Sequence, residues 1–337
     1  MANITFGIST RLNDSVFGLS QAPIRSLIED RAEAQEQNSV LPYLFNTEKT
    51  NKYMDKLTSM TGMDGFQPTG PENGAYPVDG MQESYSKILE QMEWKDSFSI
   101  SQVAVEDSVA LDLRKKPVAF TTAYYRTRER FGANLFGGAI QLANDVTIGG
   151  HTFNCQAADG QKLFSKAHPS KVSGGNQSNY FADAFSPDAL AAMETKMQNF
   201  KGDNDNLLAV APDTILIPND YKLKKAVFAA IGADQDPATA NNGYNFLFGR
   251  WRVIVWAELN NYITGGTSPW IMLDSGYNEM YDGAIWLDRI ALEVNSDIDA
   301  GTGSNVWRGR SRFTAGFNDW RFAAVGGVAS GTALISG

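Results

Sequence analysis

The chain has 337 residues, of which 43% are hydrophobic and 20% are charged, and its net charge is −9. These values are typical of a globular protein and exclude a disordered or fibrous chain, while the acidic balance argues against broad adhesion to DNA, which depends on Lys and Arg. The sequence predicts neither a secretion signal nor a membrane span. The single cysteine, Cys155, excludes an intrachain disulfide framework and fits synthesis in a reducing cytosol.

Residues 1–56 predict an N-terminal arm rather than a domain. Ile24, Leu27 and Ile28 predict one short amphipathic helix behind Pro23, and the polar segments around it are too thin to enclose a core. We expect such an arm to lie on another surface, often that of a neighbouring subunit.

Residues 57–101 predict a long excursion that leaves the body of the protein and returns. Eight of the nineteen residues from Gly62 to Gly80 are Gly or Pro, so neither a helix nor a central strand can persist there. A strand with one apolar face follows, with apolar residues at Met92, Trp94, Phe98 and Ile100. Long irregular excursions are usually functional or disordered, and we favour an interaction loop.

Residues 117–143 predict the long helix around which the other parts are organised. Apolar residues share one side of it at helical spacing: Phe120, Tyr124, Phe131, Leu135 and Leu142. Pro117 suits its first turn, and Gly132, Gly137 and Gly138 indicate that another backbone passes close by. Arg126 and Arg130, one turn apart, predict an opposite face that meets solvent or a partner.

The next segments alternate between strands and helices, so residues 186–295 predict a separate α/β lobe. A short hairpin over 147–164, which turns near 158–160, precedes this lobe. The elements of the lobe are a helix capped by Ser186, a buried strand over 214–218, a helix capped by Asn219 or Asp220, and a polar loop over 233–243. A further strand region over 306–324 puts Arg308, Arg310 and Arg312 on one face. These arginines either form salt bridges within a sheet or line a charged seam between subunits.

The sequence predicts no enzyme, no cofactor and no catalytic or metal-binding residue. Nothing orients a thiol–imidazole pair between Cys155 and His168, and zinc, acyl-transfer, nucleotide-phosphate and dinucleotide motifs are absent. The acidic run at residues 203–206 is either a calcium loop without EF-hand spacing or a solvated turn. A pair of glycosidase carboxylates stays open as an alternative.

The order of these parts resembles the major capsid proteins of tailed bacteriophages, which have the Hong Kong 97-type fold, and the likeness is greatest to the Mu-type major head subunits. The extended loop ends in Trp94–Phe98, and Val105-Glu106-Asp107 leads into the long helix. The likeness covers the chain from about residue 85 onward. Its other motifs are DGQKLFSKAHP at 159–169, which is similar to the DG-x-x-LFS-x-AHP segment of that group, PDTILIP at 212–218 and FNDWR at 317–321.

The resemblance implies an α+β fold with four parts. These are an N-terminal arm over 1–56, an extended loop over 57–101, a peripheral domain over 102–179 and 289–337 with its spine helix at 117–143, and an axial domain over 180–288. Candidate subunit contacts are Trp94, Lys95, Arg126, Arg130, Arg308, Arg310 and Arg312.

The implied function is that of a major capsid protein whose pentamers and hexamers form an icosahedral shell around double-stranded DNA. The implied partners are other copies of the chain, separate scaffolding, portal and decoration proteins, and packaged DNA through non-specific contact at the inner surface, with no membrane. The implied location is the virion, after assembly in the cytoplasm of a host bacterium. The alternatives are an encapsulin-like nanocompartment shell and, in a different class, a soluble α/β carbohydrate-active hydrolase.

Overall fold

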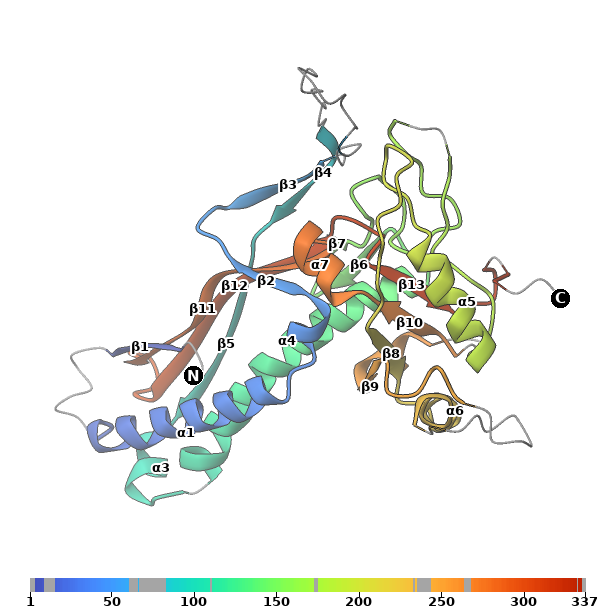
Figure 1. Ribbon diagram of the computed structural model, residues 1–337. Coiled ribbons are helices and arrows are strands. Elements are labelled where there is room, and N and C mark those ends of the chain that lie inside the picture. The colour runs from blue at the N-terminus through green and yellow to red at the C-terminus, as the bar shows by residue number, and fades with distance from the viewer. Residues whose placement is uncertain are drawn as a thin grey trace.

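The computed structural model describes residues 4–8, 16–60, 66, 83–109, 111–172, 175–232, 234, 244–263, 268–331 and 333–334. Most of the Gly/Pro-rich stretch from Gly62 to Gly80 and most of the predicted loop at 233–243 therefore lie outside the described residues. Figure 1 shows an elongated limb of sheet and helix, an α/β lobe beside it, and a hairpin that projects from the body.

A five-stranded sheet forms the limb, with the order β1-β11-β12-β5 and β2 paired to β11. The strands are β1 (Thr5–Ile8), β2 (Asn46–Lys49), β5 (Met92–Ile100), β11 (Ala284–Ile298) and β12 (Asn305–Phe317). The alternating pattern at 92–100 therefore predicted β5 correctly. In β12, Trp307 and Phe313 point into the core, and Arg308 and its alternating neighbours point outward.

The long helix α4 (Lys116–Ile140) covers the inner face of this sheet (Figure 1). It has Pro117 in its first turn, as predicted, because a proline there loses no helical hydrogen bond. A short helix α3 (Gln102–Glu106) and a π-helical turn (Leu111–Lys115) precede it. The helix ends at Ile140 rather than at the predicted residue 143, and Leu142, with φ +57°, already lies in a left-handed turn.

The three glycines of α4 make room for side chains, not for the backbone that we had predicted. A Cβ on Gly137 would lie 2.2 Å from the ring of Tyr262, and a Cβ on Gly138 would lie 2.4 Å from Val146. A Cβ on Gly132 would lie 2.5 Å from Leu41. The glycines therefore admit the N-terminal segment, the Tyr262 turn and a hairpin to the surface of the helix.

The N-terminal segment lies on the limb of its own chain. Helix α1 (Gly18–Gln37) is longer than the predicted short helix and contains Pro23, because packing on α4 stabilises a helix whose own amphipathic pattern is weak. Ile24 and Ile28 share a buried cluster with Phe120 and Trp307. The four-residue helix α2 (Leu41–Leu44) then leads into β2.

The excursion is an antiparallel hairpin of β3 (Met54–Met60) and β4 (Glu83–Glu90). Its root packs on the outer face of the limb, where Leu57 and Leu89 contact Ile285 and Leu287. The chain rejoins the five-stranded sheet at β5, so the excursion ends at Gln91, ten residues before the predicted boundary at 101.

The lobe contains a four-stranded sheet with the order β13-β10-β8-β9. Its strands are β8 (Thr214–Pro218), β9 (Arg252–Trp256), β10 (Trp270–Leu273) and β13 (Ala323–Gly326), and its helices are α5 (Pro187–Gln198), α6 (Tyr221–Ile231), α7 (Ser275–Tyr281) and the 3-10 helix η3 (Ala257–Tyr262). Ser186 and Asp220 cap α5 and α6 as predicted. The predicted axial domain ends at residue 288, but the sheet of the lobe also contains β13 from the C-terminal segment. The sheet therefore crosses the predicted domain boundary.

The predicted hairpin at 147–164 is shorter and turns earlier. Strands β6 (Asp145–Ile148) and β7 (His151–Asn154) pair across Gly149 and Gly150, whose φ angles are +58° and +81°. The predicted turn at 158–160 lies outside this hairpin, where it connects Gln156 and Lys162, the two residues of an isolated antiparallel β-bridge. The paired glycines mark the hairpin turn because both can adopt positive φ without strain.

Replacing Gly137 with Ala should destabilise the chain although Ala is the better helix former. The new methyl group would clash with the Tyr262 ring and cost about 1–3 kcal/mol, more than the roughly 1 kcal/mol of helix propensity that it adds. Urea denaturation measures the free energy of unfolding. The matched control is Gly175→Ala, whose Cβ would meet open space; equal stability of the two variants would contradict the packing described here.

Candidate functional site

The outward side of the sheet carries four of the predicted subunit-contact residues. Lys95 of β5 and Arg308, Arg310 and Arg312 of β12 share this side, and we refer to these four residues as the arginine face. Arg308 and Lys95 are exposed, and Arg310 and Arg312 are partly buried.

One carboxylate, that of Glu93, joins two members of the arginine face. Its oxygens lie 2.6 Å from Arg310 Nε and 2.7 Å from Lys95 Nζ, and a second acid, Glu293, lies 3.6 Å from Arg310. The hydrogen bonds from Lys95 and Arg310 lower the pKa of Glu93. Cross-strand pairing, the first of the two alternatives, is therefore present for Arg310, and the subunit seam stays a prediction.

Arg308 and Arg312 make no ion pair among the residues that the structure describes. The guanidinium of Arg312 lies over the ring of Tyr53, with 6.0 Å between its carbon and the ring centroid. Its Nε is buried and has no hydrogen-bond acceptor in the described part of the chain.

The other three candidates lie elsewhere. Trp94 is on the inner side of β5, where its ring stacks on Phe313 at a centroid distance of 5.0 Å. Arg126 and Arg130 project from α4, and Arg130 lies 3.7 Å from Glu258 of η3. The structure thus brings Lys95 together with the three arginines of β12 and separates them from Trp94, Arg126 and Arg130.

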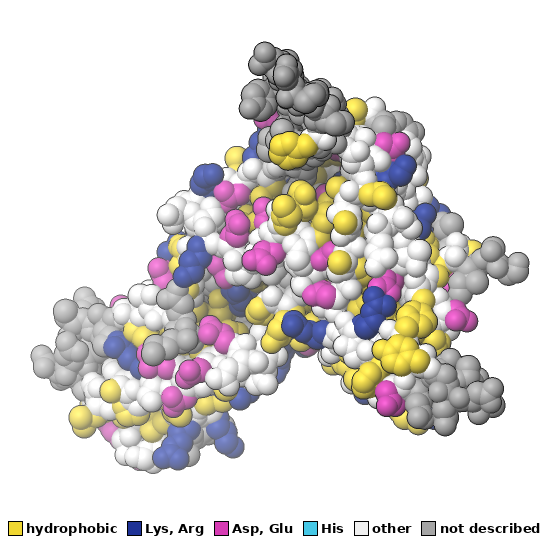
Figure 2. Space-filling model, in the orientation of Figure 1, with side chains coloured by type: hydrophobic (Ala, Val, Ile, Leu, Met, Phe, Trp, Pro, Cys, Tyr) yellow, Lys and Arg dark blue, Asp and Glu magenta, His cyan; other side chains and the backbone are white. Residues whose placement is uncertain are grey.

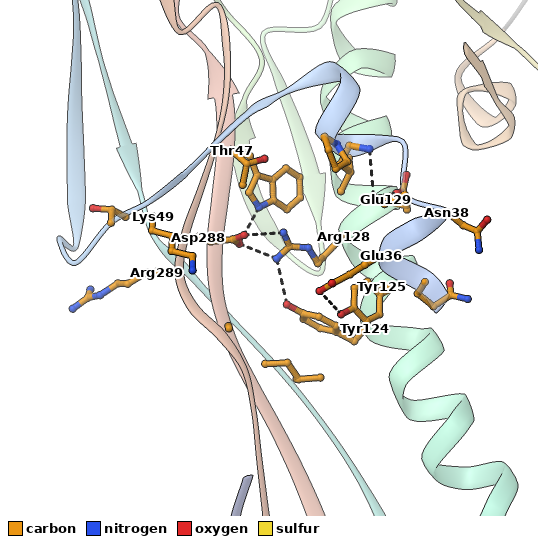
Figure 3. A pocket seen from close by; sticks show the side chains of 18 of the residues that line it. Glu36, Asn38, Thr47, Lys49, Tyr124, Tyr125, Arg128, Glu129, Asp288 and Arg289 are labelled. Carbon is orange, nitrogen blue, oxygen red and sulfur yellow. Dashed lines mark hydrogen bonds and ion pairs between the residues drawn. The ribbon is translucent and has the colours of Figure 1, made fainter. Parts of the chain in front are cut away.

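A cavity of about 440 Å³ lies where α1, α2 and β2 meet α4 and β11 (Figure 3). At its wall Arg128 of α4 donates two hydrogen bonds, of 2.8 and 2.9 Å, to the carboxylate of Asp288 on β11. The guanidinium also lies 4.8 Å from the centroid of the Trp286 ring. No local pattern in the sequence indicates this pair, because its members are 160 positions apart.

Two carboxylates of the same cavity hold the N-terminal segment on α4. Glu129 accepts hydrogen bonds from the Ser39 hydroxyl at 2.5 Å, the Val40 amide at 3.0 Å and the Trp256 indole at 3.1 Å. Glu36 accepts one from Tyr125 at 3.0 Å. Burial raises the pKa of Tyr125, so its hydroxyl keeps the proton that it donates. Both carboxylates are hydrogen-bonded to other residues of the chain, so this wall of the cavity joins the N-terminal segment to α4.

Three side chains, Ser84, Lys171 and Lys87, fasten strand β4 of the hairpin to the body, and the first two act at the end of β4 that is far from the root. The Ser84 hydroxyl donates to Asp203 at 2.5 Å, and Lys171 Nζ donates to the carbonyls of Glu83 and Ser84 at 2.6 Å each. Lys87 of β4 is 9% exposed and donates to the carbonyls of Asn154, at 3.4 Å, and Gln156. Burial lowers the pKa of Lys87 to about 8.

The segment that carries the AHP motif forms a buried polar network. His168 stacks on Trp320 with 4.2 Å between ring centroids, and its ring nitrogens contact Asp159 at 2.7 Å and Asn179 at 3.1 Å. Cys155 is fully buried elsewhere, and burial raises its thiol pKa to about 12. His168 and Cys155 therefore have different hydrogen-bond partners and do not form a thiol–imidazole pair.

The acidic run at 203–206 serves as an anchor. Asp203 is 5% exposed and accepts from Arg321 at 2.9 Å and from Ser84, so this carboxylate is not part of the predicted solvated turn. Among the described residues there is no group of three acidic, His or Cys side chains that could hold a metal ion. No described helix is both long and apolar enough to span a bilayer.

Comparison with known protein families gives a match over more than half of the chain. A family model described as "Phage capsid protein" matches residues 87–326. No curated protein matches the chain.

Several solved structures share the fold at low sequence identity. The capsid of Ralstonia phage GP4 has a TM-score of 0.51 and 11% identity, covering 82% of each chain. The mature capsid of bacteriophage PhiM1 has a TM-score of 0.52 and 8% identity, covering 86% of this chain and 87% of the other. A structure from Mycobacterium phage Patience has a TM-score of 0.50 and 11% identity, covering 98% and 94%. The α+β architecture expected from the resemblance is therefore confirmed, and the Mu-type subgroup stays a prediction.

Replacing Arg128 with Met should destabilise the chain by about 3–5 kcal/mol, because the partly buried Asp288 carboxylate would lose its cation. Urea denaturation measures the loss. Arg126→Met, two positions away and exposed, is the control and should change stability by less than about 0.5 kcal/mol. Adding Asp288→Leu to Arg128→Met should recover part of the loss, because no buried charge then stays unpaired.

Lys87 should make stability depend on pH in the alkaline range. The folded chain releases this proton near pH 8, while the unfolded chain binds it up to about pH 10.5, so the free energy of unfolding should rise with pH between those values. The rise from this one group is at most about 1.4 kcal/mol per pH unit. Denaturation of Lys87→Met across that range should lack this contribution, and the exposed Lys56→Met should retain it. Parallel curves for the wild type and Lys87→Met would show that Lys87 titrates normally.

Proposed function

The chain belongs to the phage capsid protein family, and we propose that it is the major capsid subunit of a tailed double-stranded DNA bacteriophage. The observation that carries this function is the family match over residues 87–326, joined to the fold shared with phage capsid subunits. Many copies assemble into pentamers and hexamers of an icosahedral shell that encloses the genome. The protein is a structural component of the virion.

The parts of the subunit have distinct roles in this proposal. The limb with α4 is the peripheral domain, and the lobe built on β8, β9, β10 and β13 is the axial domain, whose loops meet around the five-fold and six-fold axes. The β3–β4 hairpin is the extended loop that lies over a neighbouring subunit. Support comes from the hairpin itself, which projects from the limb, packs on it through Leu57 and Leu89, and is fastened near its far end by Lys171 and Asp203 (Figure 1).

Subunit contact is the proposed role of the arginine face and of Arg126 and Arg130. Exposed cations on an acidic chain favour contact with acidic surfaces of other copies. On the face shown in Figure 2, basic and acidic side chains are interspersed rather than separated into fields of one sign. This arrangement supports the expectation that packaged DNA is contacted weakly and without specificity.

The proposal also covers the protein's partners in assembly and the compartment in which assembly takes place. Scaffolding, portal and decoration proteins are separate chains, and assembly takes place in the cytoplasm of the host bacterium. The protein has no enzymatic role in this proposal: His168, Asp203 and Arg128 are each hydrogen-bonded to a partner within the chain, Asp159, Arg321 and Asp288 respectively, and support the fold. Membership in the phage capsid family favours a virus over an encapsulin-like compartment, and it leaves the carbohydrate hydrolase without support.

Sedimentation of the purified protein, with negative-stain imaging of the fast fraction, tests the function. We expect uniform closed shells, or rings of five and six subunits. Small shells filled with protein cargo would favour the encapsulin-like alternative. A monomer that stays unchanged at high concentration, and also after co-expression with the scaffolding protein of the same phage, would contradict the proposal.

A further inference from the structure

The imidazole ring of His168 lies where three other parts of the chain meet. The residue is 1% exposed, and its ring contacts Asp159, Asn179 and the indole ring of Trp320, which we call, together with His168, the His168 junction. Trp320 lies three residues before β13, and the Val325 amide of β13 donates to the carbonyl of Asn179 at 2.9 Å. The junction therefore joins the AHP segment to the C-terminal strand of the lobe.

Four backbone groups hold the side-chain amide of Asn179 in one orientation. Its nitrogen donates to the carbonyl oxygens of Leu163, Ala323 and Trp320, at 2.8, 3.0 and 3.4 Å. Its Oδ1 accepts a hydrogen bond from the Ser165 amide at 2.9 Å. Turning the amide over would set its oxygen against three carbonyl oxygens, so it is Oδ1 that faces His168.

Both ring nitrogens of His168 face hydrogen-bond acceptors. Nε2 lies 3.1 Å from Oδ1 of Asn179, and an amide oxygen only accepts, so Nε2 carries a hydrogen. Nδ1 lies 2.7 Å from Oδ2 of Asp159, a distance typical of a charge-assisted hydrogen bond. A neutral imidazole has a single N–H group. The junction therefore holds one proton more than a neutral ring beside a carboxylate.

Two features place this additional proton on the ring rather than on Asp159. The ring stacks on Trp320 with 4.2 Å between centroids and 8° between planes, within the range in which an indole attracts a cation. The other oxygen of Asp159 accepts from the Gln161 amide at 2.9 Å, which favours the ionised carboxylate. The Asp159 side chain is 3% exposed, so its charge needs a cation beside it.

The other charges around the junction leave Asp159 as its counter-ion. Besides Asp159, the nearby ionisable groups are Tyr85, Lys87, Lys162, Lys166, Asp203, Asp319 and Arg321. Both of these acids bind Arg321, at 2.9 and 3.2 Å. Burial raises the pKa of Tyr85 and lowers that of Lys87 to about 8. Lys162 is partly exposed and Lys166 is exposed, so water screens their charges.

We propose that His168 carries a proton on both ring nitrogens at neutral pH, and that this imidazolium makes the attachment of the C-terminal strand dependent on a bound proton. Without that proton, a nitrogen lone pair faces an oxygen lone pair at one of the two contacts, and the junction weakens. The inference goes beyond the proposed shell function and does not depend on it.

Nitrogen NMR of protein labelled at histidine tests the charge directly, because the chain contains two histidines. His151 is exposed and serves as the internal reference. At about pH 7.5, where an ordinary imidazole is mostly neutral, His168 should show two protonated ring nitrogens and His151 should show one. His151→Gln removes the reference signal and so assigns the other. A spectrum in which both rings have an unprotonated nitrogen would overturn the proposal.

Asp159→Asn is the matched variant, because it removes the charge and keeps the shape. The new amide oxygen can accept from Gln161 and its nitrogen can donate to Nδ1, so a neutral ring with its hydrogen on Nε2 satisfies every contact. The variant should therefore show one protonated nitrogen on His168. Asp205→Asn, at a side chain that is 62% exposed, is the control and should leave both nitrogens protonated. Two protonated nitrogens in Asp159→Asn would refute the role of Asp159 as counter-ion.

The pH profile of unfolding is a second readout, which a purely structural role would not move. Between about pH 6.5 and 7.5 the unfolded chain releases its imidazole proton while the folded chain keeps it, so stability should fall as the pH rises. Relative to Asp159→Asn, the unfolding equilibrium constant of the unassembled wild type should rise by up to about tenfold per pH unit. Parallel profiles for the two proteins would overturn the proposal, whether or not shells form.

Discussion

The packing of α4 against β11 and β12 is the contact on which the other parts depend. Phe131 of the helix lies 5.5 Å from Trp286 and 5.9 Å from Phe313 by ring centroids, and Trp286 stacks on Phe313 at 5.2 Å. Aromatic rings bury more surface than other side chains, and the Arg128–Asp288 pair fixes the helix along this layer. Because α4 is both packed on the sheet and ion-paired to it, α4 can serve as a platform for segments that have little core of their own.

The attached segments explain the branched shape of the subunit (Figure 1). The N-terminal segment is fastened to α4 through Glu129 and Glu36, and strand β4 of the hairpin is fastened to the body through Ser84, Lys87 and Lys171. Each attachment combines a buried apolar contact with local hydrogen bonds, so it sets the direction of the attached part. A subunit of this kind gains further stability from surfaces shared with its neighbours, as expected of a shell protein.

Local signals predicted local structure well. Alternation identified β5, and capping residues located the starts of α5 and α6, because the physical cause of each lies within a few positions of the chain. The motif around His168 was informative for a similar reason: Asp159, His168 and Asn179 form one buried network within twenty-one residues. The length of α1, the Arg128–Asp288 pair and the sheet that β13 joins were not predictable in this way. Each depends on partners far away in sequence, which periodicity and capping cannot identify.

The place of β13 has a consequence for biosynthesis. Strand β10 is wholly apolar and lies between β8 and β13, so its outer edge is closed only when residues 323–326 pair with it. While the ribosome is still translating the limb strands β11 and β12, the lobe therefore exposes the unpaired apolar edge of β10. Unpaired apolar edges invite association with other chains. Completion of the lobe is thus a late event in translation, and the order of synthesis delays the mature surface until almost all of the described chain has emerged.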